Sequence, residues 1–470
     1  MEQMSTIRMT TEMRNTMIKR LVVLGVLLGA LVCSGLAQGN GYKYGKFDPK
    51  FNRKRAIALL DAVHKAIKDS YYDPAFRGID LEARFDAAAK NMETQETNKD
   101  LFRSIASVVT DFGDSHTYFI PPERQNRVEY GFTMKVIGSG VFVVDVKKGS
   151  DAEAKGVRLG QQVLSLNGFV PGRTNASRLQ YIMYLIDPQP VLKLKLLNPD
   201  GTEVEMDVAS RFVSPDEKLS AKQKRAQEDK ERPFFCKELS ADTTACKLRT
   251  FLVDGFDVNK LMKEIGSHKK LILDLRDNGG GLVSSVLDLI GNFFEKDVLV
   301  QHERRRDKTR EIYAKGSKGK AYKGDLVVLI DSESASASEI FARVMQIEKR
   351  ATVIGDRSAG AVMTSEMTVL PVPAVDVSYG PAPAAFAFLS VTVADPIMSD
   401  GKRLEGTGVV PDLAIGANQP AMASGWDPVL SYAASFFGEK LTPAEAGKLY
   451  FLSPKPEDDV DQAPDPSGRG

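Results

Sequence analysis

The chain has 470 residues, of which 43% are hydrophobic, and this length and composition support two or three domains with substantial cores. Its 63 basic and 62 acidic residues leave a net charge of +1 at pH 7, so the chain carries no footprint for nucleic-acid binding. It has only 4 histidines, spread along the sequence, and 3 cysteines, which imply neither a metal site nor a cofactor.

Residues 1–37 are predicted to be a signal peptide. Lys19-Arg20 precede an apolar run over 21–32, and the small residues of Gly35-Leu36-Ala37 suit cleavage after the alanine. The run is short for a membrane span, so we expect an exported protein, periplasmic or extracellular, with no transmembrane span after cleavage. Lipoprotein anchoring at Cys33 is a less favoured alternative, because a valine precedes it where a small residue is expected.

Residues 48–125 are predicted to form a helical N-terminal domain with a histidine in a loop near its end. The helical pattern stops at Gly113, and His116 follows in the loop sequence Asp-Ser-His-Thr. A loop histidine taken alone is more often structural than catalytic, so its role depends on what the rest of the chain brings to it. We expect the other three histidines at the solvated surface, because they lie in a helical run or in charged, loop-like sequence: His64, His268 and His302.

Residues 127–213 are predicted to form a β-rich domain. It begins with two strand-like segments. A short capped helix follows, Gly-Ser-Asp-Ala-Glu-Ala-Lys-Gly-Val, and then come a tight turn and the strand Val-Leu-Ser-Leu-Asn-Gly. This order resembles a PDZ domain. The resemblance implies capture of a peptide end by strand addition, with Gly131 and Phe132 in the loop that binds its carboxylate. Because Thr133 replaces the glycine usual in that loop, a structural or regulatory domain is the alternative.

The other boundaries follow from composition. Residues 214–232 are dense in charge and are predicted to be an exposed helical linker, residues 233–435 an α/β domain, and residues 450–470, rich in proline and aspartate, a disordered tail. After signal cleavage two cysteines remain, Cys236 and Cys246. We expect them to form a short-loop disulfide in an exported protein, with two buried thiols as the alternative.

Two strand-to-helix connections in the α/β domain carry the chemistry. The first, over 270–282, is a buried strand that ends in Asp-Asn-Gly-Gly-Gly ahead of an apolar helix over 282–294. Glycines at such a place let backbone N–H groups approach a ligand closely. The segment lacks the Gly-Lys-Ser/Thr of a nucleotide phosphate loop, and a tight structural turn is the alternative interpretation.

The second connection contains Ser336. A strand over 325–330 leads into Ser-Ala-Ser-Glu and then into a helix over 338–349. A serine just ahead of a helix lies beside free backbone N–H groups and the positive end of the helix dipole. This environment stabilises negative charge on a substrate oxygen. A serine that only caps the helix is the alternative for this segment taken alone.

Together, the glycine cluster and the Ser-Ala-Ser-Glu-Ile segment resemble the C-terminal-processing (tail-specific) serine peptidase superfamily, over roughly residues 50–415. The resemblance implies a crotonase-like (ββα spiral) catalytic domain and makes Ser336 the nucleophile. It also implies an oxyanion hole formed by the N–H groups of Ala337 and Gly280, with a glycine next to Gly280 as the alternative.

This chain departs from the best-known members of the superfamily at the catalytic base. Those members have a lysine in a Gly-Lys-Gly context after the serine, whereas the matching residue here is Ala361, and no lysine occurs from 351 to 400. A branch without this lysine, similar to the tricorn core protease, has an Asp-x-His-Thr signature and a glutamate in Glu-Gly-x-Gly-Val-x-Pro-Asp. By this resemblance His116 is the general base, and Ser115 and Glu405 orient it.

The expected fold class is therefore multidomain α/β, with a helical N-terminal region, a PDZ-like domain and a crotonase-like catalytic domain. The expected function is that of an exported serine endopeptidase that cleaves peptides or protein tails through an acyl-enzyme. Its expected partners are peptides or unfolded protein substrates, bound either with or without recognition of their C-termini. The sequence leaves the oligomeric state open. Activity should fall below the ordinary histidine pKa of about 6.5, because a protonated base cannot accept the serine proton.

The alternative is a non-catalytic protein that binds peptides or apolar ligands on the same fold. Relatives of this kind, such as the interphotoreceptor retinoid-binding proteins, also lack the lysine, so Ala361 fits either interpretation. The joint presence of the serine, the histidine and both orienting residues favours the enzyme.

Overall fold

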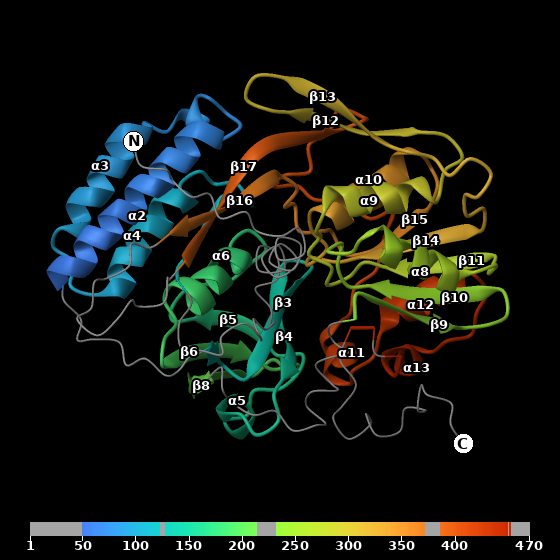
Figure 1. Ribbon diagram of the computed structural model, residues 1–470. Coiled ribbons are helices and arrows are strands. Elements are labelled where there is room, and N and C mark those ends of the chain that lie inside the picture. The colour runs from blue at the N-terminus through green and yellow to red at the C-terminus, as the bar shows by residue number, and fades with distance from the viewer. Residues whose placement is uncertain (1–48, 123–126, 214–231, 372–385, 450, 453–470) are drawn as a thin grey trace, which may run out of the picture.

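A computed structural model of the chain describes residues 49–122, 127–213, 232–371, 386–449 and 451–452 (Figure 1). The signal peptide predicted at 1–37 lies outside these residues, as do the charged linker apart from Arg232 and the tail apart from 451–452. The described chain is a mixed α/β protein with several sheets, which confirms the expected fold class at this level. Within the described ranges, no helix has the length and apolar character needed to cross a bilayer.

The first part of the chain is helical, as expected. It comprises α2 (Pro49–Ser70), the short η2 (Phe76–Gly78), α3 (Leu81–Met92) and α4 (Asn98–Thr110). Asp80 and Thr97 start the last two helices by accepting backbone N–H groups with their side chains. After α4 the chain enters β1 (Tyr118–Ile120), which pairs antiparallel with β17 (Phe386–Met398) near the other end of the sequence.

Residues 127–213 are rich in β-strands. A five-stranded antiparallel sheet has the order β3-β4-β5-β6-β7, and a two-stranded ribbon joins β2 to β8. Phe132, Met134 and Val136 alternate into the core of this unit from β3, which lies at one edge of the sheet. The elements are β2 (Arg127–Glu129), β3 (Phe132–Ile137), β4 (Gly140–Val146), α5 (Asp151–Ala154), β5 (Gln162–Leu166), α6 (Ala176–Tyr181), η3 (Ile182–Ile186), β6 (Val191–Leu197), β7 (Glu203–Ala209) and β8 (Arg211–Val213).

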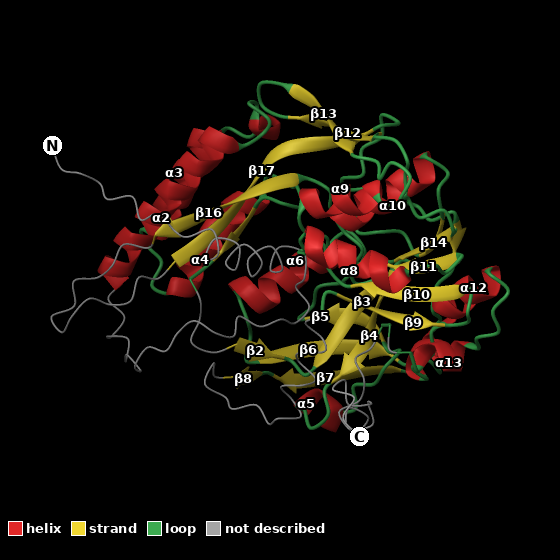
Figure 2. Cartoon of the chain, turned by 45° about the vertical axis from the view of Figure 1, so that its right-hand side comes forward, coloured by secondary structure: helices red, strands yellow, loops and turns green. Residues whose placement is uncertain are grey.

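A six-stranded sheet forms the centre of the C-terminal part, in the order β18-β15-β14-β11-β10-β9. All its pairs are parallel except β9 with β10. Helices α8, α9 and α10 cover one face, and α12 and α13 cover the other (Figure 2). The strands are β9 (Phe234–Glu238), β10 (Thr243–Leu248), β11 (Lys270–Asp274), β14 (Asp325–Ile330), β15 (Thr352–Gly355) and β18 (Leu413–Ala414), and the helices are α8 (Gly255–Ile265), α9 (Val283–Gly291), α10 (Ala337–Ile347), α12 (Pro428–Phe436) and α13 (Pro443–Gly447).

A second C-terminal sheet has the order β1-β17-β12-β13, with β16 also paired to β17. It contains β12 (Val298–Arg304), β13 (Thr309–Ala314) and β16 (Thr364–Pro371). Its long strands β16 and β17 lie against α2, while β1 lies against α4, and the apolar residues of this sheet share one core with the N-terminal helices (Figure 1). The helical region is therefore packed onto the C-terminal part rather than separate from it. The short α11 (Gln419–Ala423) leads into α12.

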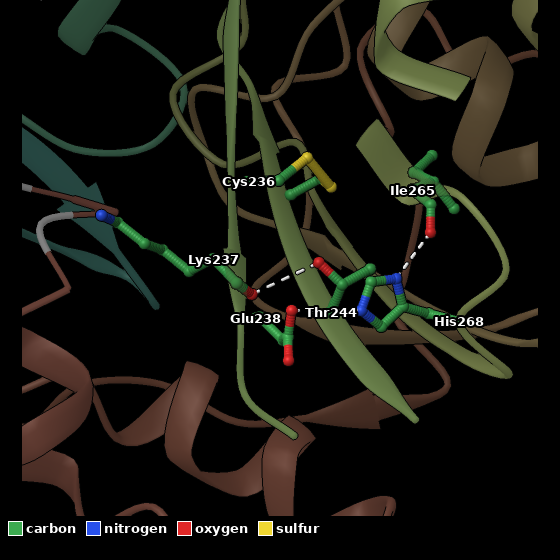
Figure 3. Close-up of a disulfide and its surroundings, with 7 residues drawn as sticks. Cys236, Lys237, Glu238, Thr244, Ile265 and His268 are labelled. Atoms are coloured by element: carbon green, nitrogen blue, oxygen red, sulfur yellow. Dashed lines mark hydrogen bonds and ion pairs between the residues drawn. A yellow bond between two sulfur atoms is a disulfide. The ribbon is translucent and has the colours of Figure 1, made fainter. Parts of the chain in front are cut away.

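Cys236 and Cys246 form the disulfide that we expected (Figure 3). They are direct partners on the antiparallel strands β9 and β10. The placing of three histidines at the solvated surface is wrong, because all three are half-buried. His64 stacks on Phe85, and the Nδ1 atom of His268 lies 2.7 Å from the Ile265 carbonyl oxygen, a bond that Figure 3 shows.

Candidate active site

Two loops meet at the carboxyl edge of the central sheet. The glycine loop (275–282) follows β11, and the nucleophile turn (331–336) follows β14, the parallel neighbour of β11. Ligand sites of open parallel sheets lie at this edge. The loops are bonded to each other, because the Asn278 carbonyl accepts the Ala335 N–H at 3.0 Å and the Ser338 hydroxyl at 2.8 Å. The two sequence motifs are thus brought into direct contact.

Ser336 stands at the start of α10 in a strained backbone conformation. Its φ of 54° and ψ of −116° are rare for any residue except glycine, and such strain costs about 1–3 kcal/mol. The cost is offset by the buried Glu339, whose Oε2 accepts the Ser336 N–H at 3.0 Å. The other Glu339 oxygen accepts the Gly360 N–H at 2.8 Å and the Ser358 hydroxyl at 2.5 Å. A sharp strand-to-helix turn of this kind presents a serine at the edge of a sheet.

Gly280 is pressed against this serine. A Cβ atom on it would lie 2.7 Å from the Ser336 Cβ and 3.0 Å from the Ala337 nitrogen, so only glycine fits. The Ala337 N–H is the first of α10 and has no acceptor within the helix. The Gly280 N–H donates to Asn278 Oδ1 at 2.9 Å, so an oxyanion at this point would share that donor with Asn278.

The histidine loop is organised by Asp114. Its carboxylate accepts the backbone N–H groups of His116 at 3.0 Å and of Thr117 at 2.7 Å. It also accepts the hydroxyl groups of Tyr71, at the end of α2, and of Thr392, on β17, at 2.7 and 2.8 Å. Five hydrogen bonds in all, including one from the Thr117 hydroxyl, therefore fix the loop to both the helical region and the second sheet.

Glu405, Ser115 and His116 form one hydrogen-bonded chain. The Ser115 hydroxyl donates to Glu405 Oε2 at 2.9 Å and lies 2.6 Å from His116 Nδ1. The Ser115 N–H also donates to Glu405 Oε1 at 2.8 Å. Because the hydroxyl has a single proton and gives it to the carboxylate, Nδ1 must carry the ring proton. The second ring nitrogen, Nε2, is then an acceptor, as a general base requires.

Ser336 and His116 are not hydrogen-bonded to each other, although both belong to the described residues. The two halves of the site meet at residues 361–362. The Ser336 N–H donates to the Ala361 carbonyl at 2.8 Å, and the next N–H, of Val362, donates to Glu405 Oε2 at 2.9 Å. The alanine that replaces the usual lysine therefore lies between the serine and the glutamate. Catalytic hydrogen bonds often form only when substrate is bound.

Burial shifts the pKa of both titratable side chains in the hydrogen-bonded chain from Glu405 to His116. It lowers the pKa of His116 to about 4, against the opposing effect of the Asp114 carboxylate. Burial also raises the pKa of Glu405 above its ordinary value, although the donors on Val362 and Ser115 work in the opposite direction. At neutral pH the imidazole is thus neutral and able to take a proton.

Gly131 immediately precedes β3, and Phe132 is the first residue of that strand. Gly131 has a φ of +78°, and a Cβ on it would lie 2.4 Å from the Ser150 Cβ, so glycine is required there. The Phe132 side chain points into the core of the β-rich unit. Within the described ranges no group of three or more histidine, cysteine, aspartate or glutamate side chains is placed to hold a metal ion.

Sequence reasoning missed the residues that hold the site together. Asp114 belongs to the Asp-x-His-Thr spacing, and Glu339 is the last polar residue of Ser-Ala-Ser-Glu, so both lay within motifs already recognised. Each is an acidic residue two or three positions from a residue whose backbone N–H it accepts. This short spacing is the sequence signal that could have identified them. Thr392 gave no such signal, because it is one of many β-branched residues in a strand.

Comparison with known proteins shows which family part of this chain resembles. Residues 243–415 match the sequence profile of Peptidase family S41. The chain is 25% identical over 367 residues to the chloroplastic carboxyl-terminal-processing peptidase 3 of Arabidopsis thaliana. The aligned region covers 74% of this chain and 66% of that protein. It is 24% identical over 299 residues to the tail-specific protease of Haemophilus influenzae, covering 60% of this chain and 41% of the relative. The chain thus spans less than two thirds of these relatives.

Among solved structures, mature CPAF superimposes with a TM-score of 0.59 at 14% identity, covering 85% of this chain and 96% of CPAF. At this identity the likeness establishes the fold alone. The resemblance predicted from the sequence is confirmed at this level: residues 243–415 match Peptidase family S41, and carboxyl-terminal-processing and tail-specific proteases are among the proteins similar to this chain.

Proposed function

We propose that this protein is a serine endopeptidase that works through Ser336 and His116, with Ser115 and Glu405 orienting the histidine. The observation that carries the proposal is the continuous chain from Glu405 through the Ser115 hydroxyl to His116 Nδ1, built beside a strained serine. A neutral imidazole whose Nδ1 proton is held in place offers Nε2 as a base. A protein that only bound peptides would have no need for this arrangement.

The chemistry follows from the geometry. The Ser336 hydroxyl attacks the peptide carbonyl carbon while His116 Nε2 accepts its proton, and the carbonyl oxygen becomes an oxyanion. The N–H groups of Ala337 and Gly280 stabilise that oxygen. The imidazolium then gives its proton to the leaving amine as the C–N bond breaks. Water, deprotonated by the same imidazole, then attacks the ester carbon of the acyl-enzyme. The ester C–O bond breaks to release the new carboxyl end, and the imidazolium returns its proton to the Ser336 oxygen.

The domain roles extend this proposal. The unit at 127–213 is a PDZ-like domain that binds peptide ends near Gly131 and Phe132, and the unit at 233–435 is a crotonase-like catalytic domain. Support comes from the antiparallel sheet with an edge strand β3 after a tight glycine turn, and from the central parallel sheet with helices on both faces. The substrates are peptides or protein tails, and the protein acts after export, where its disulfide is stable.

A fluorophosphonate probe tests the proposed nucleophile directly. The native protein should form a covalent adduct, and mass spectrometry of its peptides should locate the added mass on Ser336. The urea-unfolded protein is the matched control and should stay unlabelled, because the serine is activated only by the folded site. Absence of any adduct on the folded protein would contradict a serine peptidase and leave the ligand-binding alternative.

The pH dependence of the reaction is expected to differ from that of an exposed histidine. Since burial lowers the pKa of His116 to about 4 from 6.5, kcat/KM for a peptide should hold through pH 6.5 and fall only towards pH 4. The expectation from the sequence, a fall already below about 6.5, is revised accordingly. The measurement is kcat/KM against pH, and an acidic limb centred near 6.5 would count against the buried base.

A stability control belongs to this measurement. The unfolded chain takes up the His116 proton near pH 6.5 and the native chain only near 4, so acid between these values also favours unfolding. Each rate is therefore paired with a circular dichroism spectrum at the same pH, and only rates from native protein enter the profile.

A further inference from the structure

One carboxylate, that of Asp331, joins the glycine loop to the nucleophile turn. Its Oδ1 accepts the Asp277 N–H of the glycine loop at 3.1 Å. The same oxygen accepts the N–H groups of Glu333 and Ser334 in the nucleophile turn, at 3.0 and 3.1 Å. This oxygen therefore helps to fix the relative position of the two loops, together with the Asn278 carbonyl that accepts from Ala335 and Ser338.

A cation from the β-rich unit neutralises this carboxylate. Lys135, on β3, contacts both Asp331 Oδ2 and Asp277 Oδ1 through its Nζ. The lysine and Asp331 are almost enclosed, with side chains 12% and 11% exposed. Burial disfavours the charge on Lys135, but the two aspartates outweigh it and raise its pKa, so the lysine is a cation at neutral pH. Lys247 is also near, 3.8 Å from Asp277 Oδ2.

Asp277 is a strained residue at the point where this cation acts. Its φ of 57° is in the left-handed region, three residues before Gly280. Without Lys135, the nearly enclosed Asp331 would face the partly exposed Asp277 as a like charge, with Lys247 as a remaining cation near Asp277. Repulsion there would separate the loops that Asp331 joins.

We propose that Lys135 and Asp331 are positioning residues that hold the glycine loop against the nucleophile turn, so that the β-rich unit completes the catalytic site. The inference rests on the proposed function and adds a requirement to it. The neighbouring contacts agree: the Ser332 hydroxyl, in the nucleophile turn, donates to the Val136 carbonyl on β3 at 2.5 Å. The edge of β3 thus lies directly on the turn that carries the nucleophile.

The kinetic test compares Lys135→Met with a control at a second contact between the same units. Arg173→Met is that control, since Arg173 binds Asp356 at 2.6 Å and donates its hydrogen bonds to residues outside both catalytic loops. Lys135→Met should lower kcat by about 10²-fold with KM nearly unchanged, the pattern expected when reacting groups are misplaced by about 1 Å. Arg173→Met should keep most of the activity. Equal losses of kcat in the two variants would mean that Lys135 only holds the β-rich unit against the C-terminal part, and would overturn the proposal.

Two further variants separate positioning from general stability. Lys135→Arg keeps the cation and should keep most of kcat. Lys135→Met combined with Asp277→Asn removes one of the two facing carboxylates, and should recover at least part of the loss. A double variant no more active than Lys135→Met would overturn the charge argument.

Hydrogen exchange gives a readout that needs no turnover. Lys135→Met should lose amide protection in residues 275–282 and 331–336, whereas Arg173→Met should keep it. If the wild type is inactive but Lys135→Met loses this protection, the proposed function fails and the positioning role stands. If the wild type is active and protection in Lys135→Met is unchanged, the positioning role fails alone.

Discussion

Replacement of Ser336 or of His116 by alanine is expected to lower kcat for peptide hydrolysis by about 10⁶-fold, and the double variant should be no worse than either single one. The serine cannot attack without a base, and the base has no proton to accept without the serine. The two residues therefore act as one unit. The residual rate would come from substrate binding and the oxyanion donors.

The measurement is single-turnover hydrolysis of a peptide ester or amide, with labelling by the fluorophosphonate as a second readout. Ser284→Ala is the matched control, because Ser284 is exposed on α9 and should retain full activity. Losses that multiplied in the double variant would mean that His116 and Ser336 act independently. That outcome would remove His116 from the role of base, whatever the size of its own effect.

Replacement of Glu405 by glutamine is expected to lower kcat by about 10²–10⁴-fold, with little change in KM. The two Glu405 oxygens accept three hydrogens, from the Ser115 N–H, the Ser115 hydroxyl and the Val362 N–H. A glutamine has one acceptor oxygen, so its NH₂ group must face one of these donors in either orientation. The Ser115 hydroxyl is then displaced or reversed, and the proton on His116 Nδ1 loses its fixed acceptor.

Glu366→Gln is the matched control for this change, since Glu366 is an exposed glutamate on β16 and should tolerate the substitution. Ser115→Ala is the informative companion. It removes the hydroxyl that links the carboxylate to the ring, and it should cost activity while leaving the carboxylate charge in place. An active Glu405→Gln variant would show that the carboxylate is structural, and that the ring is oriented by Asp114 and its neighbours alone.

The sequence predicted the local parts of the site well because each is encoded within a few residues. The strand, the small-residue turn and the helix around Ser336 follow from apolar periodicity and helix-start chemistry, and the structure has them at β14 and α10. The glycine cluster likewise predicts that its backbone approaches another segment closely. In the structure, Gly280 packs against Ser336 in this way.

The parts that the sequence could not predict are those in which distant segments compensate one another. Lys135 alternates outward on a strand, where a solvated lysine is the ordinary interpretation, yet its charge is enclosed between two aspartates that come 142 and 196 residues later. Lys247 and Arg276 are almost fully buried in the same way, with Asp274 and Asp427 as partners. Local periodicity carries no information about such pairing, because the partners meet only in the tertiary fold.

The relay between Glu405 and Ser115 joins residues that are 290 positions apart. A chain still being synthesised has the histidine early but receives the glutamate only near its end. A fragment that stops before residue 405 lacks the carboxylate that, in the proposed mechanism, fixes the tautomer of the imidazole. Under the proposed mechanism, the order of synthesis alone should therefore keep an unfinished chain from cutting its neighbours, or itself, before it has folded.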